Sequence, residues 1–188
     1  MLKIAITGSL CAGKTTIAHL LKRKGFTVIS VDAIIAKLYK KKSIAKKIKS
    51  LFGSLNKKTI AEQAFSNPVK RKALESILHS QARKILLKKL SLLEKERFVF
   101  VEAPLLFESG FEQDFDFVVA VCAHPKTRLY RMLSKGFSEK EFLEREKAQL
   151  PEKEKVKRAN FAIDNSGSIA ELKPQIERLL LKLEALNA

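Results

Sequence analysis

One segment near the N-terminus has the residue types and spacing needed to bind phosphate. It reads Gly8-Ser9-Leu10-Cys11-Ala12-Gly13-Lys14-Thr15, a complete match to G-x-x-x-x-G-K-[ST]. The glycines allow a tight turn whose backbone N–H groups face inward, and the following helix adds the positive end of its dipole. Lys14 would reach the β- and γ-phosphates of a nucleoside triphosphate, and the Thr15 hydroxyl would ligate Mg²⁺.

Short β-rich segments alternate with helical patterns along the chain. The predicted strands are near-continuous apolar runs at 2–6, 27–31, 98–101, 117–122 and 161–163. The clearest helical pattern runs from about 69 to 96, and a last helix from about 168 to 186 begins with Ser168 and Glu171 at capping-box spacing. This alternation predicts an α/β fold with a mostly parallel sheet. The phosphate-loop motif directly follows the first predicted strand and leads into an amphipathic segment at 15–22. This position disfavours the alternative that the motif is only a glycine turn between a strand and a helix.

Two acids stand where predicted strands end. Asp32 follows the second strand, 17 positions after Thr15, and ligands of parallel sheets bind beyond the carboxyl ends of strands. Its carboxylate could accept a proton from an attacking hydroxyl or help to hold Mg²⁺. The alternative, an N-cap for a helix that begins at Ala33, stays open. Glu102 ends the third strand, a position suited to a carboxylate near the metal, although this pattern alone is weak evidence.

A group of cations follows the fourth strand. Arg128, Arg131 and Lys135 are spaced by three and then four residues, which predicts that one helix face presents all three. Such a face, with Arg145 and Lys147 nearby, could close over ATP and neutralise charge during transfer. The alternative is an exposed basic helix without a ligand.

Composition sets the broad class. The chain has 188 residues with 46% hydrophobic content, which predicts one soluble domain at 1–188. It has no apolar run of membrane-spanning length, and its N-terminus does not resemble a signal peptide. The two cysteines, Cys11 and Cys122, lack disulfide or metal spacing, so we expect a reducing, cytoplasmic compartment.

The charge balance is unusual. Lys and Arg number 37 against 20 acids, a net charge of +17 with pI near 9.9. This excess suggests nucleic-acid binding, but solvated helix faces and general attraction for anionic substrates explain it as well. No sequence pattern of a zinc finger, RNA-recognition module or basic zipper is present, so we expect no specific nucleic-acid partner.

Further motifs carry a resemblance that covers nearly the whole chain. They are Thr7 to Thr15, Ser30-Val31-Asp32, Phe65-Ser66-Asn67-Pro68, Leu78-His79, Pro104-Leu105-Leu106-Phe107-Glu108, Arg145 with Gln149, and Ile163-Asp164-Asn165-Ser166-Gly167. Together they resemble the dephospho-CoA kinase family, and the Pro104–Glu108 run is the most specific of them. The resemblance implies that ATP and 3′-dephospho-CoA give ADP and CoA, with Mg²⁺ as cofactor, in a cytoplasmic monomer or weak homo-oligomer.

The resemblance also implies an architecture. It is a three-layer P-loop NTPase fold with a five-stranded parallel sheet, a helical acceptor-binding insertion and a small helical lid. The nucleotide core would comprise about 1–34, 96–127 and 159–188, the acceptor-binding region about 35–95, and the lid about 128–158.

Site residues carry over position by position. The catalytic residues would be Asp32 as the base for the ribose 3′-hydroxyl, Lys14 and Arg131. ATP would contact Gly8, Ser9, Leu10, Cys11, Ala12, Gly13, Lys14, Thr15, Thr16, Arg131 and Asn165. The acceptor would contact Asp32, Phe65, His79, Pro104, Leu105 and Leu106, and the metal Thr15, Asp32 and Glu102. His79 lies between apolar neighbours, so it is not expected to be a catalyst.

Several positions depart from the family pattern. Ser9 and Cys11 replace loop glycines, Ser30 replaces the first acid of a D-A-D element, and Ser80 follows His79 where proline is common. Lys58 and Lys135 stand where arginines are usual, and an ammonium lacks bidentate geometry at phosphate. The replacement of arginine by lysine predicts a lid that still works but supports slower turnover.

Three other functions agree with part of the sequence. A kinase acting on a nucleoside or its monophosphate is disfavoured by the Pro104–Glu108 run and the Asn165 element. A nucleic-acid-stimulated NTPase is motivated by the charge alone. A binding protein without catalysis is disfavoured because Lys14, Thr15 and Asp32 are all present.

Overall fold

The computed structural model describes residues 1–186, apart from the side chain of Phe65. It divides into two compact units, one formed by Met1–Ile29 with Leu93–Ala188 and the other by Ser30–Leu92. The first unit holds most of the sheet and the phosphate loop, and the second is helical.

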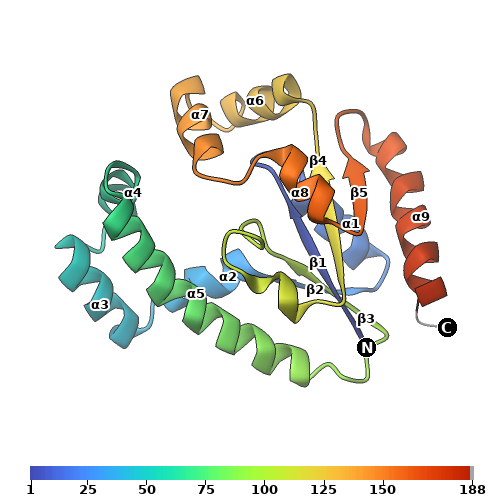
Figure 1. The fold of residues 1–188 in the computed structure, drawn as a ribbon, viewed down its shortest axis with the longest axis horizontal. Helices are drawn as coiled ribbons and strands as arrows, with labels where there is room; N and C mark the ends of the chain where they lie inside the picture. Colours follow the sequence, from blue (N-terminus) through green and yellow to red (C-terminus); the bar gives the residue numbers. More distant parts are fainter. Residues whose placement is uncertain (187–188) are drawn as a thin grey trace. The chain divides into compact units, whose positions relative to one another are not determined.

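The sheet has five parallel strands in the order β2-β3-β1-β4-β5 (Figure 1). Their bounds are β1 Leu2–Gly8, β2 Thr27–Ser30, β3 Phe98–Glu102, β4 Phe117–Cys122 and β5 Phe161–Asp164. The predicted parallel α/β fold is therefore confirmed. β1 runs two residues further than predicted, because Thr7 and Gly8 still pair with Ala120 and Val121 of β4.

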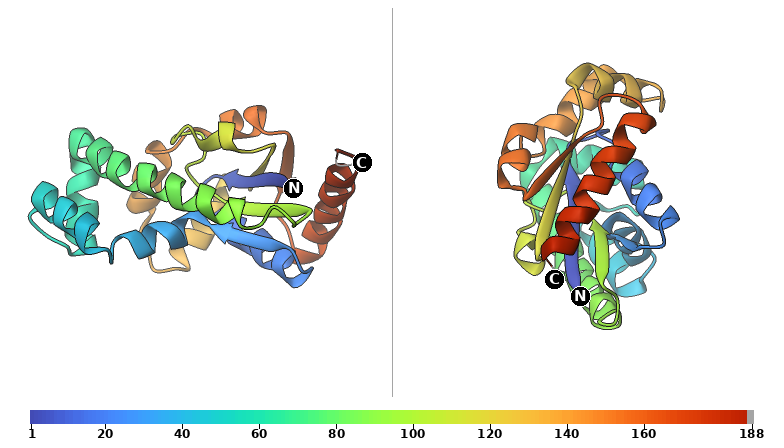
Figure 2. Two further views of the ribbon diagram at one scale, coloured as in Figure 1. Left: turned by 90° about the horizontal axis from the view of Figure 1, so that it is seen from below. Right: turned by 90° about the vertical axis from the view of Figure 1, so that its right-hand side faces the viewer.

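Helices cover both faces of the sheet in the first unit. The helices of the unit are α1 Lys14–Arg23, α6 Pro125–Leu133, α7 Glu139–Lys147, α8 Glu152–Arg158 and α9 Ile169–Leu186, with a short 3₁₀ helix, η1, at Phe111–Asp114. Of these, α1, α8 and α9 pack against strands, whereas α6 and α7 pack against each other. Residues of α1 and α9, such as Ile17 and Ile176, share one buried core with Ile4 and Ile6 of β1. On the other face α8 packs against β1 and β4 (Figure 2). The result is the expected three-layer arrangement.

The second unit contains α2 Val31–Leu38, α3 Lys42–Phe52, α4 Lys57–Ser66 and α5 Pro68–Ser91. The apolar stripe of the long helix is buried at Leu78, Ala82, Leu86 and Leu90. Asn67 caps its start by accepting from the N–H groups of Val69 and Lys70. The predicted end near residue 96 is wrong, because a turn follows Ser91 and leads the chain into β3.

Ser30 decides how α2 begins. Its backbone is extended, and its hydroxyl accepts a hydrogen bond from Ala33 N at 3.3 Å. The helix starts at Val31, so the alternative that Asp32 caps a helix beginning at Ala33 is wrong. Serine and aspartate are both good N-caps, which explains how Ser30 can replace an acid without loss of the helix start. Asp32 lies in the first turn and is an exposed residue.

No helix within the described 1–186 is both long and apolar enough to span a membrane.

Candidate active site

The loop between β1 and α1 depends on two glycines. Gly8 has φ +142°, and a Cβ there would lie 2.0 Å from the carbonyl oxygen of Val121 in β4. Gly13 has φ +99° and precedes the first residue of α1. Cys11 has φ +57°, a left-handed conformation that glycine would adopt with less strain. The two glycines of the sequence pattern are therefore required by the conformation and close packing of the loop backbone.

Gly13→Ala is expected to weaken ATP binding. The new Cβ would lie 1.9 Å from Asn165 Nδ2, so Asn165 must shift, and the positive φ adds strain of about 1–3 kcal/mol. We expect the dissociation constant for ATP, measured by calorimetric titration, to rise about tenfold or more. Gly25→Ala is the matched control, because Gly25 also has a positive φ (+90°) but nothing lies within 4 Å of its added Cβ. Equal ATP affinities in the two variants would contradict the expectation.

Lys14 is held inside the phosphate loop. Its side chain is buried, and Nζ donates to the carbonyl oxygens of Gly8 at 2.9 Å and Ser9 at 2.8 Å. The ammonium therefore lies at the loop mouth, where it can exchange carbonyl oxygens for the more strongly charged oxygens of a phosphate.

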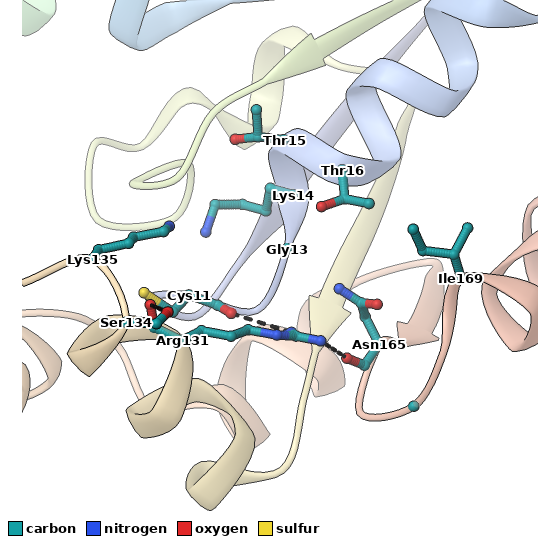
Figure 3. Close-up of a pocket in the computed structure, with 11 residues that line it drawn as sticks. Cys11, Gly13, Lys14, Thr15, Thr16, Arg131, Ser134, Lys135, Asn165 and Ile169 are labelled. Carbon is teal, nitrogen blue, oxygen red and sulfur yellow. Dashed lines mark hydrogen bonds between the residues drawn. The ribbon is translucent and has the colours of Figure 1, made fainter.

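A cavity of about 420 Å³ opens beside this loop in the first unit (Figure 3). Its lining joins the loop and α1 to the end of α6 and the segment after β5. The lining residues are Cys11, Gly13, Lys14, Thr15, Thr16, Arg131, Ser134, Lys135, Asn165, Gly167 and Ile169. Seven of these residues were predicted from the sequence as ATP contacts: Cys11, Gly13, Lys14, Thr15, Thr16, Arg131 and Asn165. Ser134 and Ile169 were not predicted, and no sequence pattern marks them.

Arg131 and Asn165 brace the loop from behind. Arg131 Nη2 donates to the carbonyl oxygen of Asn165 at 2.8 Å, and Nη1 donates to that of Cys11 at 3.3 Å. Asn165 is buried, and its Nδ2 donates to the carbonyl oxygen of Ala12 at 2.7 Å. Two segments more than 100 residues from the loop thus fix its backbone (Figure 3). This geometry brings both predicted ATP residues to the cavity.

Arg128 does not belong to the cavity. Its side chain is 3% exposed, with Nη2 2.6 Å from Glu146 Oε1 and Nε donating to the carbonyl oxygen of Ala123. The predicted face of three cations is therefore wrong, because ion pairing draws Arg128 inward toward α7 and α8. Arg131 and Lys135 do line the cavity, with Lys135 beyond the end of α6. Arg145, predicted nearby, lies over the ring of Phe137 at 4.6 Å.

The side-chain oxygens of Thr15 and Glu102 lie next to each other. The Thr15 hydroxyl donates to Glu102 Oε1 at 2.6 Å, and Glu102 is buried at the end of β3. Mg²⁺ in kinases is held by one or two such protein oxygens together with the substrate phosphates, so these residues fit that ion. Among the described residues, no cluster of three or more His, Cys, Asp and Glu side chains could hold a metal alone.

Lys155 is a buried cation that sequence analysis missed. It is 0% exposed, with Nζ 2.8 Å from Glu108 Oε1, and it also donates to Gln149 Oε1 and to the carbonyl oxygen of Pro104. The same Pro104 oxygen accepts from the Thr7 hydroxyl at 3.3 Å. The ammonium therefore joins α8 to the 104–108 segment, next to the strand that enters the phosphate loop. A lysine in a charged helix gives no sequence signal for such a contact.

The predicted acceptor residues lie in both units. In the first, Pro104 and Leu105 are half-buried, whereas Leu106 is fully buried and can affect an acceptor only by supporting this segment. In the second, Asp32 lies on α2 and His79 on α5, where burial lowers the pKa of His79, partly opposed by the charge of Glu75. The Phe65 side chain lies outside the part of the chain that is described.

Cys11 is expected to be the reactive thiol of the chain. It is half-buried and lines the cavity, with Sγ 3.6 Å from the sulfur of Met132. Burial, with the charges of Glu152 and Asp164, raises the pKa of Cys122 to about 11, so that thiol stays protonated at pH 8. We expect iodoacetamide at pH 8 to inhibit the enzyme, and bound ATP to protect it.

Matched variants test this assignment. Cys11→Ser should resist the reagent, and Cys122→Ser should be inhibited at the parent rate. Inhibition of Cys11→Ser at the parent rate would show that Cys11 is a packed, unreactive thiol.

Comparison with known proteins decides the family. The family described as dephospho-CoA kinase matches residues 2–171. The chain is 38% identical over 187 residues to a dephospho-CoA kinase of Thermus thermophilus, covering 96% of this chain and 91% of the relative. It is 32% identical over 192 residues to that of Aquifex aeolicus, covering 97% and 98%. The chain belongs to the dephospho-CoA kinase family.

Solved structures agree with this membership. A crystal structure from Thermus thermophilus has a TM-score of 0.85 at 37% identity and covers 97% of both chains. The dephospho-CoA kinase from Campylobacter jejuni has a TM-score of 0.72 at 29% identity, covering 99% and 98%. A shikimate kinase from Bacteroides thetaiotaomicron, 18% identical with a TM-score of 0.59, shares the fold. As a member of the dephospho-CoA kinase family, the chain is an ATP-using P-loop kinase for a small molecule.

Proposed function

We propose that this chain phosphorylates the ribose 3′-hydroxyl of 3′-dephospho-CoA with ATP and releases CoA and ADP, the last step of coenzyme A synthesis. The observation that carries the proposal is the complete phosphate site, Lys14 in its loop beside the Thr15–Glu102 pair, in a chain of this family. The site supports phosphoryl transfer, and family membership supports the choice of acceptor.

Lys14 and the loop supply most of the electrostatic stabilisation. The backbone N–H groups of such a loop and the start of α1 favour the negative charge of the β-phosphate. Lys14 exchanges its two carbonyl partners for phosphate oxygens, so its charge opposes the charge that builds up in the transition state. Arg131 keeps the loop backbone in place and presents its guanidinium at the cavity.

Asp32 is proposed as the base. The acceptor 3′-oxygen forms a bond to the γ-phosphorus while the bond from that phosphorus to the β,γ-bridging oxygen breaks. The hydroxyl proton passes to the Asp32 carboxylate, and ADP leaves. The position is suited to this role because Asp32 is an exposed residue in the first turn of α2.

Mg²⁺ would be held by the Thr15 hydroxyl and the Glu102 carboxylate, with Asp32 as a further proposed ligand, and would supply positive charge to the β- and γ-phosphates. The acceptor is proposed to bind through Asp32, Phe65, His79, Pro104 and Leu105, with Leu106 supporting the last two from below. The proposed acceptor-binding region is 35–95 and the proposed lid is 128–158.

An acceptor panel tests the function. ADP formation from ATP and Mg²⁺ is measured with 3′-dephospho-CoA, adenosine, AMP or shikimate, and the product is identified by mass spectrometry. We expect turnover with 3′-dephospho-CoA and a product whose added phosphate is on the 3′-oxygen. Faster turnover with another acceptor would overturn the proposed acceptor and leave the phosphate site unaffected.

A further inference from the structure

The positive charge of the chain is concentrated in one unit. Residues 30–92 contain 16 Lys and Arg against 3 Asp and Glu, a net charge of +13. The other 125 residues contain 21 basic and 17 acidic residues, a net charge of only +4. The second unit therefore carries about three quarters of the +17 on one third of the chain.

A general preference for lysine does not explain this asymmetry. Such a preference would raise lysine in both units, yet the larger difference is in the acids, which are about one residue in 21 in the second unit and one in 7 elsewhere. Solvated helix faces ordinarily mix both signs, because like charges at i,i+4 cost a few tenths of a kcal/mol per pair. The second unit pairs Arg71 with Glu75, but three acids cannot neutralise sixteen cations.

These cations are on the surface and are widely spread. The exposed lysines of the unit are Lys37, Lys40, Lys41, Lys42, Lys46, Lys47, Lys49, Lys57, Lys58, Lys72, Lys84, Lys88 and Lys89. On α3, Lys42, Lys46 and Lys49 form one stripe, because i, i+4 and i+7 share a helix face. On α5, cations occur from Lys70 to Lys89 of a helix about 36 Å long. This spread exceeds what a single diphosphate group can contact.

We propose that the second unit is a binding surface for the phosphate backbone of nucleic acid, without base or sugar preference. Regular phosphates along an extended chain match an extended array of ammonium groups, and counterion release drives the association. Phe52 is buried and Tyr39 half-buried, so the aromatic side chains that are described in this unit offer bases no fully exposed ring on which to stack. Lysine also lacks the fork that reads base edges.

The surface fits nucleic acid better than lipid. Membrane-surface helices insert an apolar face below the headgroups. Here the apolar faces of α3 and α5 are already buried within the unit, at Ile44 and Ile48 and at Leu78 and Leu86. The exposed faces of these helices are therefore mainly charged, and they suit a partner that is bound by charge without insertion of apolar side chains.

Binding of labelled oligonucleotides tests the proposal. Fluorescence anisotropy of a 20-nucleotide oligouridylate is measured with the full chain between about 50 and 200 mM salt. We expect binding without ATP, equal affinity within about threefold for the matched oligodeoxythymidylate, and a steep loss of affinity with salt.

Two quadruple variants of equal net charge test whether binding depends on the lysines of the second unit or only on the total charge of the chain. The first replaces Lys41, Lys42, Lys46 and Lys49 by Gln, and the second replaces the exposed first-unit residues Lys22, Lys140, Lys153 and Lys157 by Gln. The first should lose at least tenfold in affinity at 100 mM salt and lower the salt slope by about 2–3. The second should stay within about twofold of the parent, and circular dichroism checks the fold of both.

Equal losses in the two variants would overturn the proposal. So would the absence of oligonucleotide binding at 50 mM salt, or binding only to phosphatidylglycerol vesicles.

Discussion

Asp32→Asn is expected to lower kcat with 3′-dephospho-CoA by about 10²–10⁴-fold, because an amide of the same shape cannot accept the hydroxyl proton. ATP affinity should stay near that of the parent, since the loop, Lys14 and the Arg131–Asn165 brace are unchanged. The helix start should also be preserved, because Ser30 supplies the cap. Steady-state kinetics and ATP titration measure the two effects separately.

Glu62→Gln is the matched control for this variant. Glu62 is an exposed acid of the same helical unit, so its replacement removes the same charge from the unit without touching the proposed base. Its kcat should stay within about twofold of the parent. A kcat for Asp32→Asn within about threefold of the parent would rule out Asp32 as the base. Parallel loss of ATP binding would show that its proposed role as a metal ligand outweighs its role as the base.

Lys155→Met is expected to destabilise the fold by about 3–5 kcal/mol, because it removes a fully buried ammonium and leaves the half-buried Glu108 carboxylate without its cation. Glu108 Oε2 already lacks a hydrogen-bond partner, so the lost ion pair is not replaced locally. Chemical denaturation followed by circular dichroism measures the free energy of unfolding. Lys157→Met, an exposed position of the same helix, should change it by about 0.5 kcal/mol or less.

A second substitution separates charge from packing. Glu108→Gln removes the unpaired charge, and its amide oxygen can still accept from the Leu150 N–H. The double variant Lys155→Met with Glu108→Gln should therefore recover most of the lost stability. If Lys155→Met alone costs under about 1 kcal/mol, the buried ammonium does not hold the 104–108 segment.

The sequence by itself determined the parallel α/β fold and the phosphate loop. Short, near-continuous apolar runs are typical of strands covered on both faces. The 8–15 pattern directly after such a strand is typical of a phosphate-binding loop. Ser168 and Glu171 cap the last helix as their spacing predicted. These features depend on residues close together in the chain, where geometry follows from local chemistry.

Only the tertiary structure decided which polar side chains meet. The spacing of Arg128 and Arg131 is helical for both, yet Arg128 turns inward to Glu146 while Arg131 reaches Cys11, 120 residues away. Lys155 meets Pro104 across 51 residues, and no pattern in α8 distinguishes it from its exposed neighbours. Such contacts follow from how packed layers place distant helix faces against one another. The buried ammonium and guanidinium must find these partners, because an unpaired charge in the core costs several kcal/mol.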